Sequence, residues 1–244
     1  MTKSLTPKTD NQKKLINLIN SKVLTVATGS AGSGKSYIAA CMAAEALQSK
    51  SVRKIIITRP NVSVGTSLGF FPGLLEEKLA PWVIPILGTI TEYLGKGVIE
   101  SQLKNGNIEL VPFETVRGRS FDNCFVILDE AQNTTVEEMK AFITRLGEHT
   151  KCVVTGDLTQ TDLGSYNGLW HLLKLVDKNE ELSKYVGRVF FTSDDIVRSG
   201  ICKLFVLAYE HDKEAKKNET ATDYINSLDD VALRNELREQ YSRK

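Results

Sequence analysis

The chain contains an eight-residue stretch, GSAGSGKS, whose residue types suit the binding of phosphate groups. It matches the pattern GxxxxGK[ST] and precedes the helix-forming run YIAACMAAEAL. Glycines let the backbone curl so that N–H groups point at phosphate oxygens, and the following helix adds a favourable dipole. A glycine turn with an exposed lysine is the alternative. The residues predicted to bind nucleotide phosphates are Gly29, Ser30, Ala31, Gly32, Ser33, Gly34, Lys35 and Ser36.

A second motif, CFVILDEAQ, supplies carboxylates at the end of an apolar run. Lys35 is expected on the β- and γ-phosphates, and Ser36 and Asp129 are expected to hold Mg²⁺ between them. Glu130 is expected to orient, or take a proton from, a water that attacks the γ-phosphate. The alternative for Glu130 is a cap on the following turn.

Two glutamines complete the predicted nucleotide site. Gln160, in VVTGDLTQTDL, follows another apolar run, where a polar side chain can sense the γ-phosphate; a solvated turn residue is the alternative. Gln12, upstream of the phosphate loop, carries an amide that can pair with adenine N6 and N7 and so select ATP. A surface glutamine at a helix start is an equally open alternative at this point.

Short β-branched runs alternate with longer helical patterns, which is typical of an α/β fold with a mostly parallel, doubly wound sheet. Because several runs are apolar at successive positions, we expect strands that are buried on both faces. Residues 61–106 are predicted to form a helical insertion between two strands. The expected strands cover residues 23–28, 54–59, 107–112, 124–129, 151–156 and 187–192.

Composition narrows the class of protein further. The net charge of +1 does not indicate a polyanion partner, so a nucleic-acid surface would have to be a local basic patch. The four cysteines lack metal-binding spacing. The start of the chain lacks the apolar core of a signal peptide, and no stretch is long enough to span a bilayer. We therefore expect a cytoplasmic protein that does not bind membranes.

Taken in order, Gln12, the phosphate loop, LDEAQNTT, FITRLG and TGDLTQTDL resemble the PhoH family of ATPases, which is similar to the ATP-binding half of superfamily 1 helicases. The resemblance covers about residues 8–211. It implies a P-loop NTPase with a RecA-like three-layer α/β/α sandwich, ATP hydrolysis and a role in RNA metabolism, and it favours Gln12 as an adenine reader. The sequence departs from the family in the shortened stretch GSYNGLW. We expect an ATPase domain over 1–212 and a polar helical tail over 213–244.

The ATP site needs an arginine to stabilise charge on the transferring phosphate, and the 244 residues contain no second lobe to supply it. Arg198 and Arg145 are the candidates for nucleotide contact, within the chain or from a neighbouring subunit, with Arg119 third. An ion pair with a nearby carboxylate is the alternative for each. The resemblance suggests a homo-oligomer, with a hexamer favoured.

An RNA path has to be built from local charge. Arg59, Arg117 and Arg119 follow predicted strands and are expected to contact RNA phosphates beside the nucleotide. The rings of Phe70, Phe71 and Trp82 offer surfaces for base stacking, although core packing is favoured for them. The polar tail, with a possible helix over 223–241, is either a docked helix or a partly disordered segment that binds a partner.

The residues and the resemblance together predict a Mg²⁺-dependent ATPase that acts on single-stranded RNA, with helicase-like remodelling as its output. Two other classes stay open. One is an oligomeric ATP-dependent scaffold with slow hydrolysis. The other is a P-loop kinase, which Glu130 disfavours because a residue that activates water would waste ATP.

Overall fold

The computed structural model of the chain describes residues 5–60, 75–164 and 166–218. Within these ranges, side chains are described everywhere except in 75–82 and 210–218. Its elements, in chain order, are α1 (Asp10–Ser21), β1 (Leu24–Gly29), α2 (Lys35–Gln48), β2 (Lys54–Thr58), α3 (Leu75–Leu94), α4 (Lys96–Lys104), β3 (Ile108–Leu110), η1 (Phe113–Thr115), β4 (Cys124–Leu128), η2 (Ala131–Asn133), α5 (Val136–Ile143), β5 (Lys151–Gly156), α6 (Gly168–Lys178), α7 (Glu180–Tyr185), β6 (Val186–Phe191), η3 (Ser193–Asp195) and α8 (Gly200–Asn218).

Six strands form one sheet in the order β3-β2-β4-β5-β1-β6, and every pair of neighbours is parallel. Each strand coincides with one of the six apolar runs, so the predicted strands are confirmed to within two residues at each end. The order places β5 between β1 and β4. The carboxyl ends of these three strands therefore meet at one edge of the sheet.

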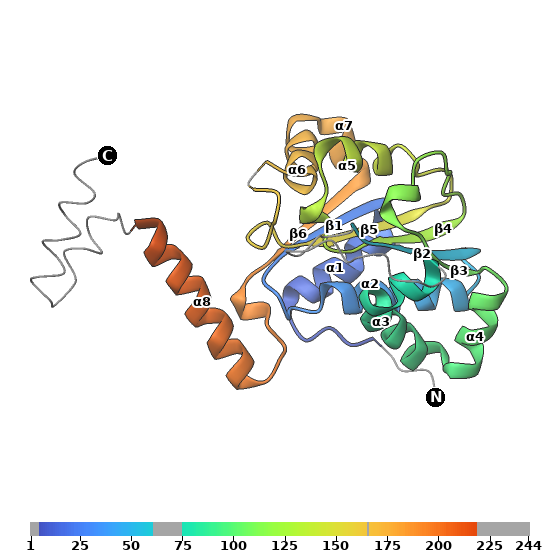
Figure 1. The fold of residues 1–244 in the computed structure, drawn as a ribbon, viewed down its shortest axis with the longest axis horizontal. Helices are drawn as coiled ribbons and strands as arrows, with labels where there is room; N and C mark the ends of the chain where they lie inside the picture. Colours follow the sequence, from blue (N-terminus) through green and yellow to red (C-terminus); the bar gives the residue numbers. More distant parts are fainter. Residues whose placement is uncertain (1–4, 61–74, 165, 219–244) are drawn as a thin grey trace, which may run out of the picture. The chain divides into compact units, whose positions relative to one another are not determined.

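Helices cover both faces of the sheet, which confirms the three-layer α/β/α prediction (Figure 1). Successive side chains of a strand point to opposite faces, so Ile55 and Ile57 join the core under α1, α2 and α3, whereas Ile56 joins the core under α5 and α6. All five residues of β4 are buried. This two-sided burial explains why the central strands are apolar at successive positions.

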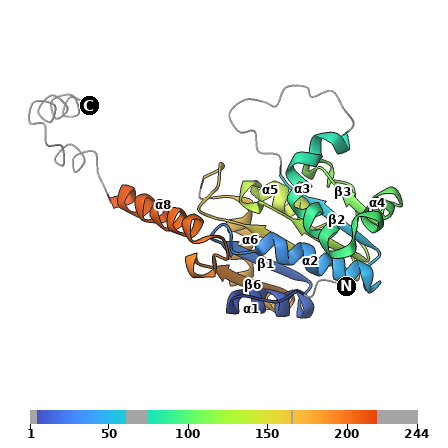
Figure 2. The same cartoon turned by 90° about the horizontal axis from the view of Figure 1, so that it is seen from below.

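The helices between β2 and β3 pack on the sheet beside α2 (Figure 2). Val83, Ile86 and Ile90 recur on one side of α3 and are buried in the same core as α2. The predicted helical insertion is therefore confirmed for residues 75–104. Residues 61–74, which begin it, lie outside the described part of the chain.

The chain divides into two compact units, Met1–Val197 and Arg198–Lys244. In the described part of the second unit, residues 198–218, α8 continues through residue 213, where the sequence suggested that a polar tail begins. The helix predicted within 223–241 lies outside the described residues. Within the described helices, none combines the length and the apolar character needed to cross a bilayer.

Candidate nucleotide-binding site

The phosphate loop joins the end of β1 to the start of α2. Gly29, Gly32 and Gly34 all have left-handed backbone angles, with φ of 114°, 78° and 88°, a region that glycine enters without strain. A Cβ on Gly29 would lie 1.9 Å from the carbonyl oxygen of Phe191, so β6 leaves room only for glycine there. Gly34 caps α2 without any side-chain hydrogen bond. The first-turn N–H groups of α2 are therefore left for an anion, so the loop fits a nucleotide phosphate.

Three contacts within the first unit hold the loop in this shape. The fully buried Ser33 hydroxyl donates to the Ser30 carbonyl at 2.8 Å. The Ser33 carbonyl accepts from Gln12 Nε2 at 2.9 Å, and the Gly32 carbonyl accepts from the backbone N–H of Val197 at 3.2 Å. The loop is thus braced by α1 and by the chain that follows η3.

Lys35 turns its amine back over the loop, where Nζ donates to the carbonyl oxygen of Gly29 at 2.6 Å. Burial lowers the pKa of Lys35, while the charges of Asp157, Glu130 and Asp129 act in the opposite direction. The amine thus lies in the field of three carboxylates that converge from the ends of β4 and β5. A cation at this position complements the negative charge of a polyphosphate.

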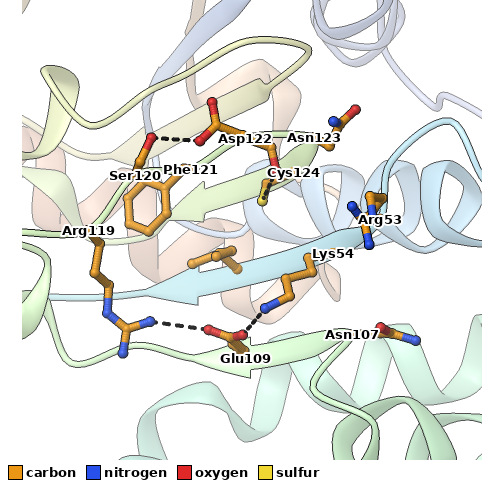
Figure 3. Close-up of a pocket in the computed structure, with 11 residues that line it drawn as sticks. Arg53, Lys54, Asn107, Glu109, Arg119, Ser120, Phe121, Asp122, Asn123 and Cys124 are labelled. Carbon is orange, nitrogen blue, oxygen red and sulfur yellow. Dashed lines mark hydrogen bonds and ion pairs between the residues drawn. The ribbon is translucent and has the colours of Figure 1, made fainter.

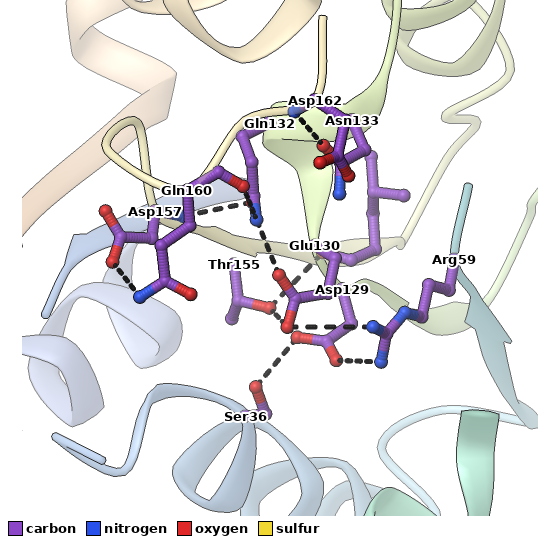
Figure 4. Close-up of polar contacts among 11 residues, drawn as sticks. Ser36, Arg59, Asp129, Glu130, Gln132, Asn133, Thr155, Asp157, Gln160 and Asp162 are labelled. Atoms are coloured by element: carbon purple, nitrogen blue, oxygen red, sulfur yellow. Dashed lines mark hydrogen bonds and ion pairs between the residues drawn. The ribbon is translucent and has the colours of Figure 1, made fainter. Parts of the chain in front are cut away.

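Asp129 and Ser36 approach each other as the metal prediction requires. Ser36 Oγ lies 2.7 Å from Asp129 Oδ1, and the same carboxylate oxygen accepts from the Thr155 hydroxyl at 2.5 Å (Figure 4). Mg²⁺ prefers hard oxygen ligands and in nucleotide sites takes only one or two from the protein. The hydroxyl and carboxylate fit that pattern. The described residues hold no group of three or more His, Cys, Asp or Glu that would cage a metal ion.

Glu130 has an unusual backbone for a residue with a side chain, with φ of 54° and ψ of 40°. Such left-handed angles cost about 1–3 kcal/mol and concentrate at functional sites. Its carboxylate accepts from Gln132 Nε2 at 2.6 Å. Arg59, from the end of β2, lies 3.9 Å from Glu130 Oε1 and 3.8 Å from Asp129 Oδ2 (Figure 4). Arg59, predicted to contact RNA, therefore faces the two acids of the nucleotide site.

Gln132 is a site residue that the motifs in the sequence did not single out. Its side chain is buried, and besides holding Glu130 it accepts from the backbone N–H of Asp157 at 3.0 Å. Its Nε2 also lies 3.4 Å from the Gln160 carbonyl. Gln160, the predicted γ-phosphate sensor, donates its own amide to Asp157 Oδ2 at 2.9 Å. Its place in the motif LDEAQNTT, two residues after Glu130, was the available signal.

Gln12, the predicted adenine reader, lies in the first turn of α1 and is buried. Its Oε1 accepts from the backbone N–H of Lys8 at 2.7 Å while its Nε2 binds the loop. A primary amide keeps a second N–H and a second lone pair, so adenine pairing by Gln12 stays a prediction.

Arg119 lies at the opposite edge of the sheet from the phosphate loop. It lines a pocket of about 530 Å³ with Lys54 and Cys124, which begin β2 and β4. Its guanidinium lies 3.2 Å from Glu109, which also pairs with Lys54 (Figure 3). The sequence suggested that Arg119 lies beside the nucleotide, but the segment 116–123 returns the chain to the amino ends of the strands.

The other predicted arginines fall in three places. Arg145 follows α5, and its backbone carbonyl accepts from Phe121 N just before β4, so it too lies at the amino end of the strands. Arg117 is exposed in the turn after η1. Arg198 opens the second unit, directly after Val197. Phe70 and Phe71 lie outside the described residues, as does the side chain of Trp82.

The six-stranded parallel sheet, the glycine-rich loop that opens a helix and the acidic pair on a neighbouring strand define a P-loop nucleoside triphosphatase fold. Residues 4–210 match the family described as PhoH-like protein, so the chain belongs to the PhoH-like protein family.

Known relatives agree with this assignment. The chain is 40% identical over 214 residues to a PhoH-like protein of Mycobacterium bovis, covering 87% of this chain and 60% of the relative. It is 42% identical over 212 residues to Protein PhoH of Escherichia coli, covering 85% and 59%. The chain thus spans about three fifths of the length of these relatives. The large terminase of a thermophilic bacteriophage shares the fold, with a TM-score of 0.52 at 14% identity over 80% of this chain and 48% of that one.

Proposed function

We propose that the protein binds ATP together with Mg²⁺ and hydrolyses the γ-phosphate. The observation that carries this proposal is the convergence of Lys35, Ser36, Asp129 and Glu130 at one edge of the sheet, with Ser36 Oγ 2.7 Å from Asp129. These are the groups that phosphate binding, metal binding and water activation need.

Each residue has a defined task. The loop N–H groups and Lys35 bind the phosphates, and Ser36 and Asp129 hold Mg²⁺, which when bound neutralises charge on the phosphate oxygens. Glu130 orients the attacking water and accepts its proton. Gln132 holds the Glu130 carboxylate by the hydrogen bond at 2.6 Å. A carboxylate placed to activate water favours hydrolysis over transfer of the phosphate to another acceptor.

Two variants test the proposal by separating binding from hydrolysis. Glu130→Gln is expected to bind ATP normally and to lower turnover by about 10²–10⁴-fold, the range that a general base contributes. Lys35→Ala is expected to raise the Kd for ATP by about tenfold or more, because it removes charge-assisted hydrogen bonds to the phosphates. Binding of a fluorescent ATP analogue and phosphate release measure the two effects.

The control is Glu137→Gln, which removes an exposed carboxylate from the first turn of α5. It should change neither the binding of the ATP analogue nor the rate of phosphate release. Normal hydrolysis by Glu130→Gln would disprove its catalytic assignment.

The proposal extends to partners. Single-stranded RNA is the proposed nucleic acid, supported by the family resemblance. A homo-oligomer, with a hexamer favoured, is proposed to bring Arg198 or Arg145 of one subunit to the phosphates of another. The position of Arg145 at the amino ends of the strands supports a contact between subunits over one within the chain.

A further inference from the structure

Three aromatic rings and a lysine form a surface cluster at the start of α6, here called the aromatic patch: Tyr166, Trp170, His171 and Lys174. The ring centroids of Tyr166 and Trp170 are 5.2 Å apart, and those of Tyr166 and His171 are 6.1 Å apart in a T-shaped arrangement. Lys174 Nζ lies 5.6 Å from the Trp170 ring centroid. Tyr166 is 63% exposed, so most of its surface faces solvent.

The helix itself forces this arrangement. Leu169, Leu172 and Leu173 turn one face of α6 into the core, so Trp170 and Lys174 occupy the outer face. Asn167 caps the helix by accepting from Trp170 N at 3.0 Å. Tyr166 directly precedes the cap residue Asn167, and His171 lies four residues after that cap. A contact between these two positions fixes the angle at which the chain enters a helix. That role needs one apolar contact and leaves the exposed area of Tyr166 unexplained.

The patch is connected to the nucleotide site by hydrogen bonds. The buried Asn167 donates to Gly164 O at 3.1 Å and lies 3.4 Å from Thr161 Oγ1. The Thr161 hydroxyl donates to the Gln132 carbonyl at 3.0 Å, and Gln132 in turn holds Glu130. The turn that carries Tyr166 is thus linked to the proposed catalytic carboxylate through three buried or half-buried residues.

We propose that the aromatic patch binds unpaired bases of a single-stranded nucleic acid, with Tyr166 as the stacking surface and Lys174 beside it for the phosphate backbone. Exposed rings with a neighbouring cation bind single strands by stacking, with little dependence on sequence. The inference rests on the proposed action on single-stranded nucleic acid and assigns it a site. Binding at Tyr166 would be transmitted through Asn167, Thr161 and Gln132 to Glu130.

Fluorescence anisotropy tests this with labelled twelve-nucleotide uridine and thymidine strands and with an abasic strand of equal length. Tyr166→Ala is expected to weaken binding of both base-bearing strands by about 5- to 100-fold, the effect of losing one stacked base. Tyr166→Phe keeps the ring and should bind within about twofold of the natural chain. The abasic strand should bind the natural chain and Tyr166→Ala equally, because it has nothing to stack.

Tyr185→Ala is the matched control and should leave strand binding unchanged. Tyr185 on α7 is 61% exposed and belongs to none of the ring contacts found among the described residues. If Tyr166→Ala bound the strands as the natural chain does and had only a lower melting temperature, Tyr166 would serve only as a contact at the start of the helix. That result would overturn this inference and leave the proposed action on nucleic acid standing. If the natural chain bound no strand at all, both the inference and the proposed action on nucleic acid would fail. ATP turnover in the absence of nucleic acid is judged separately, by Glu130→Gln.

Discussion

The amide of Gln132 uses both of its ends, one on Glu130 and one on the backbone N–H of Asp157. The first bond aims the carboxylate that is proposed to activate water, and the second joins the end of β4 to the end of β5. Because the side chain is buried, neither bond can be replaced by solvent at no cost. A single residue therefore couples the acid pair to the segment that carries Gln160.

Gln132→Met keeps the size of the side chain and removes both bonds. The Asp157 N–H is then buried without its acceptor, which should lower the free energy of unfolding by about 1–3 kcal/mol. We expect ATP turnover to fall by about tenfold or more, since a mispositioned catalytic group commonly costs that much. Urea unfolding and phosphate release measure the two effects.

Asn133→Ala serves as the comparison, because Asn133 follows Gln132 on η2 and its side chain accepts from the exposed backbone N–H of Asp162. Equal turnover in the two variants would show that the Gln132 bond to Glu130 has no catalytic consequence.

Among the elements, α1 and the end of β6 are joined by a buried carboxylate. Asp195 Oδ2 accepts from Asn11 Nδ2 at 2.8 Å and from Thr192 N at 3.0 Å. Burial acts to raise the pKa of Asp195, but hydrogen bonds from Asn11, Thr192 and Thr9 outweigh burial and hold that pKa below its ordinary value of 3.8. This contact fixes the helix that places Gln12 against the phosphate loop.

Asp195→Ala is expected to lower the free energy of unfolding by about 1–3 kcal/mol at pH 7, the contribution of hydrogen bonds to a charged group. Because the pKa is lower in the folded state, the carboxylate stabilises the fold above pH 3.8 and loses this effect as the pH falls through the folded-state pKa. The difference between the variant and the natural chain should therefore shrink near pH 3. Urea unfolding at both pH values measures it.

Asp194→Ala, at the neighbouring exposed position, should be close to neutral at both pH values. If the free energy of unfolding that Asp195→Ala loses stayed constant down to pH 3, packing and not the charged hydrogen bonds would account for that loss.

For the whole molecule, one edge of the sheet gathers the phosphate loop, the acid pair and the Gln160 segment. Among the described residues, Arg59 is the cation outside the phosphate loop that lies beside Asp129 and Glu130. Arg145 belongs to the other edge of the sheet, and Arg198 begins the second unit. The proposed source of a further arginine is therefore a neighbouring subunit.

Mixing two inactive variants tests this arrangement. Arg198→Ala and Lys35→Ala should each lower turnover strongly, by about 10³-fold or more for an arginine that stabilises the transferring phosphate. If the arginine crosses between subunits, a mixture of the two should regain part of the activity, because some sites combine an intact loop with an intact arginine. The same experiment with Arg145→Ala separates the two candidates.

Sedimentation velocity of Glu130→Gln with ATP and Mg²⁺ should show a species larger than a monomer. Arg188→Ala is the control for the mixing experiment. The Arg188 guanidinium pairs with Asp177 on the surface, so this variant should be active without a second variant in the mixture. A natural chain that stayed monomeric with ATP and Mg²⁺ while it hydrolysed ATP at its full rate would disprove the subunit contact.

Strands, loop and acid pair follow from local patterns in the sequence. Apolar runs fix the strands because burial on both faces requires them, and the phosphate loop is recognisable because glycines, a lysine and a serine must stand at fixed spacing. Asp129 was predictable in the same way, as the polar residue that ends a buried strand. These features depend on neighbours along the chain.

Only the tertiary structure decided which distant residues meet. The strand order brings Arg59 to the acids and Gln132 between β4 and β5, whereas the chain's return to the amino ends of the strands carries Arg119 away. The aromatic patch depends equally on which face of α6 is buried. The physical reason is that strand order and helix orientation are set by packing of the whole core, which no local spacing encodes.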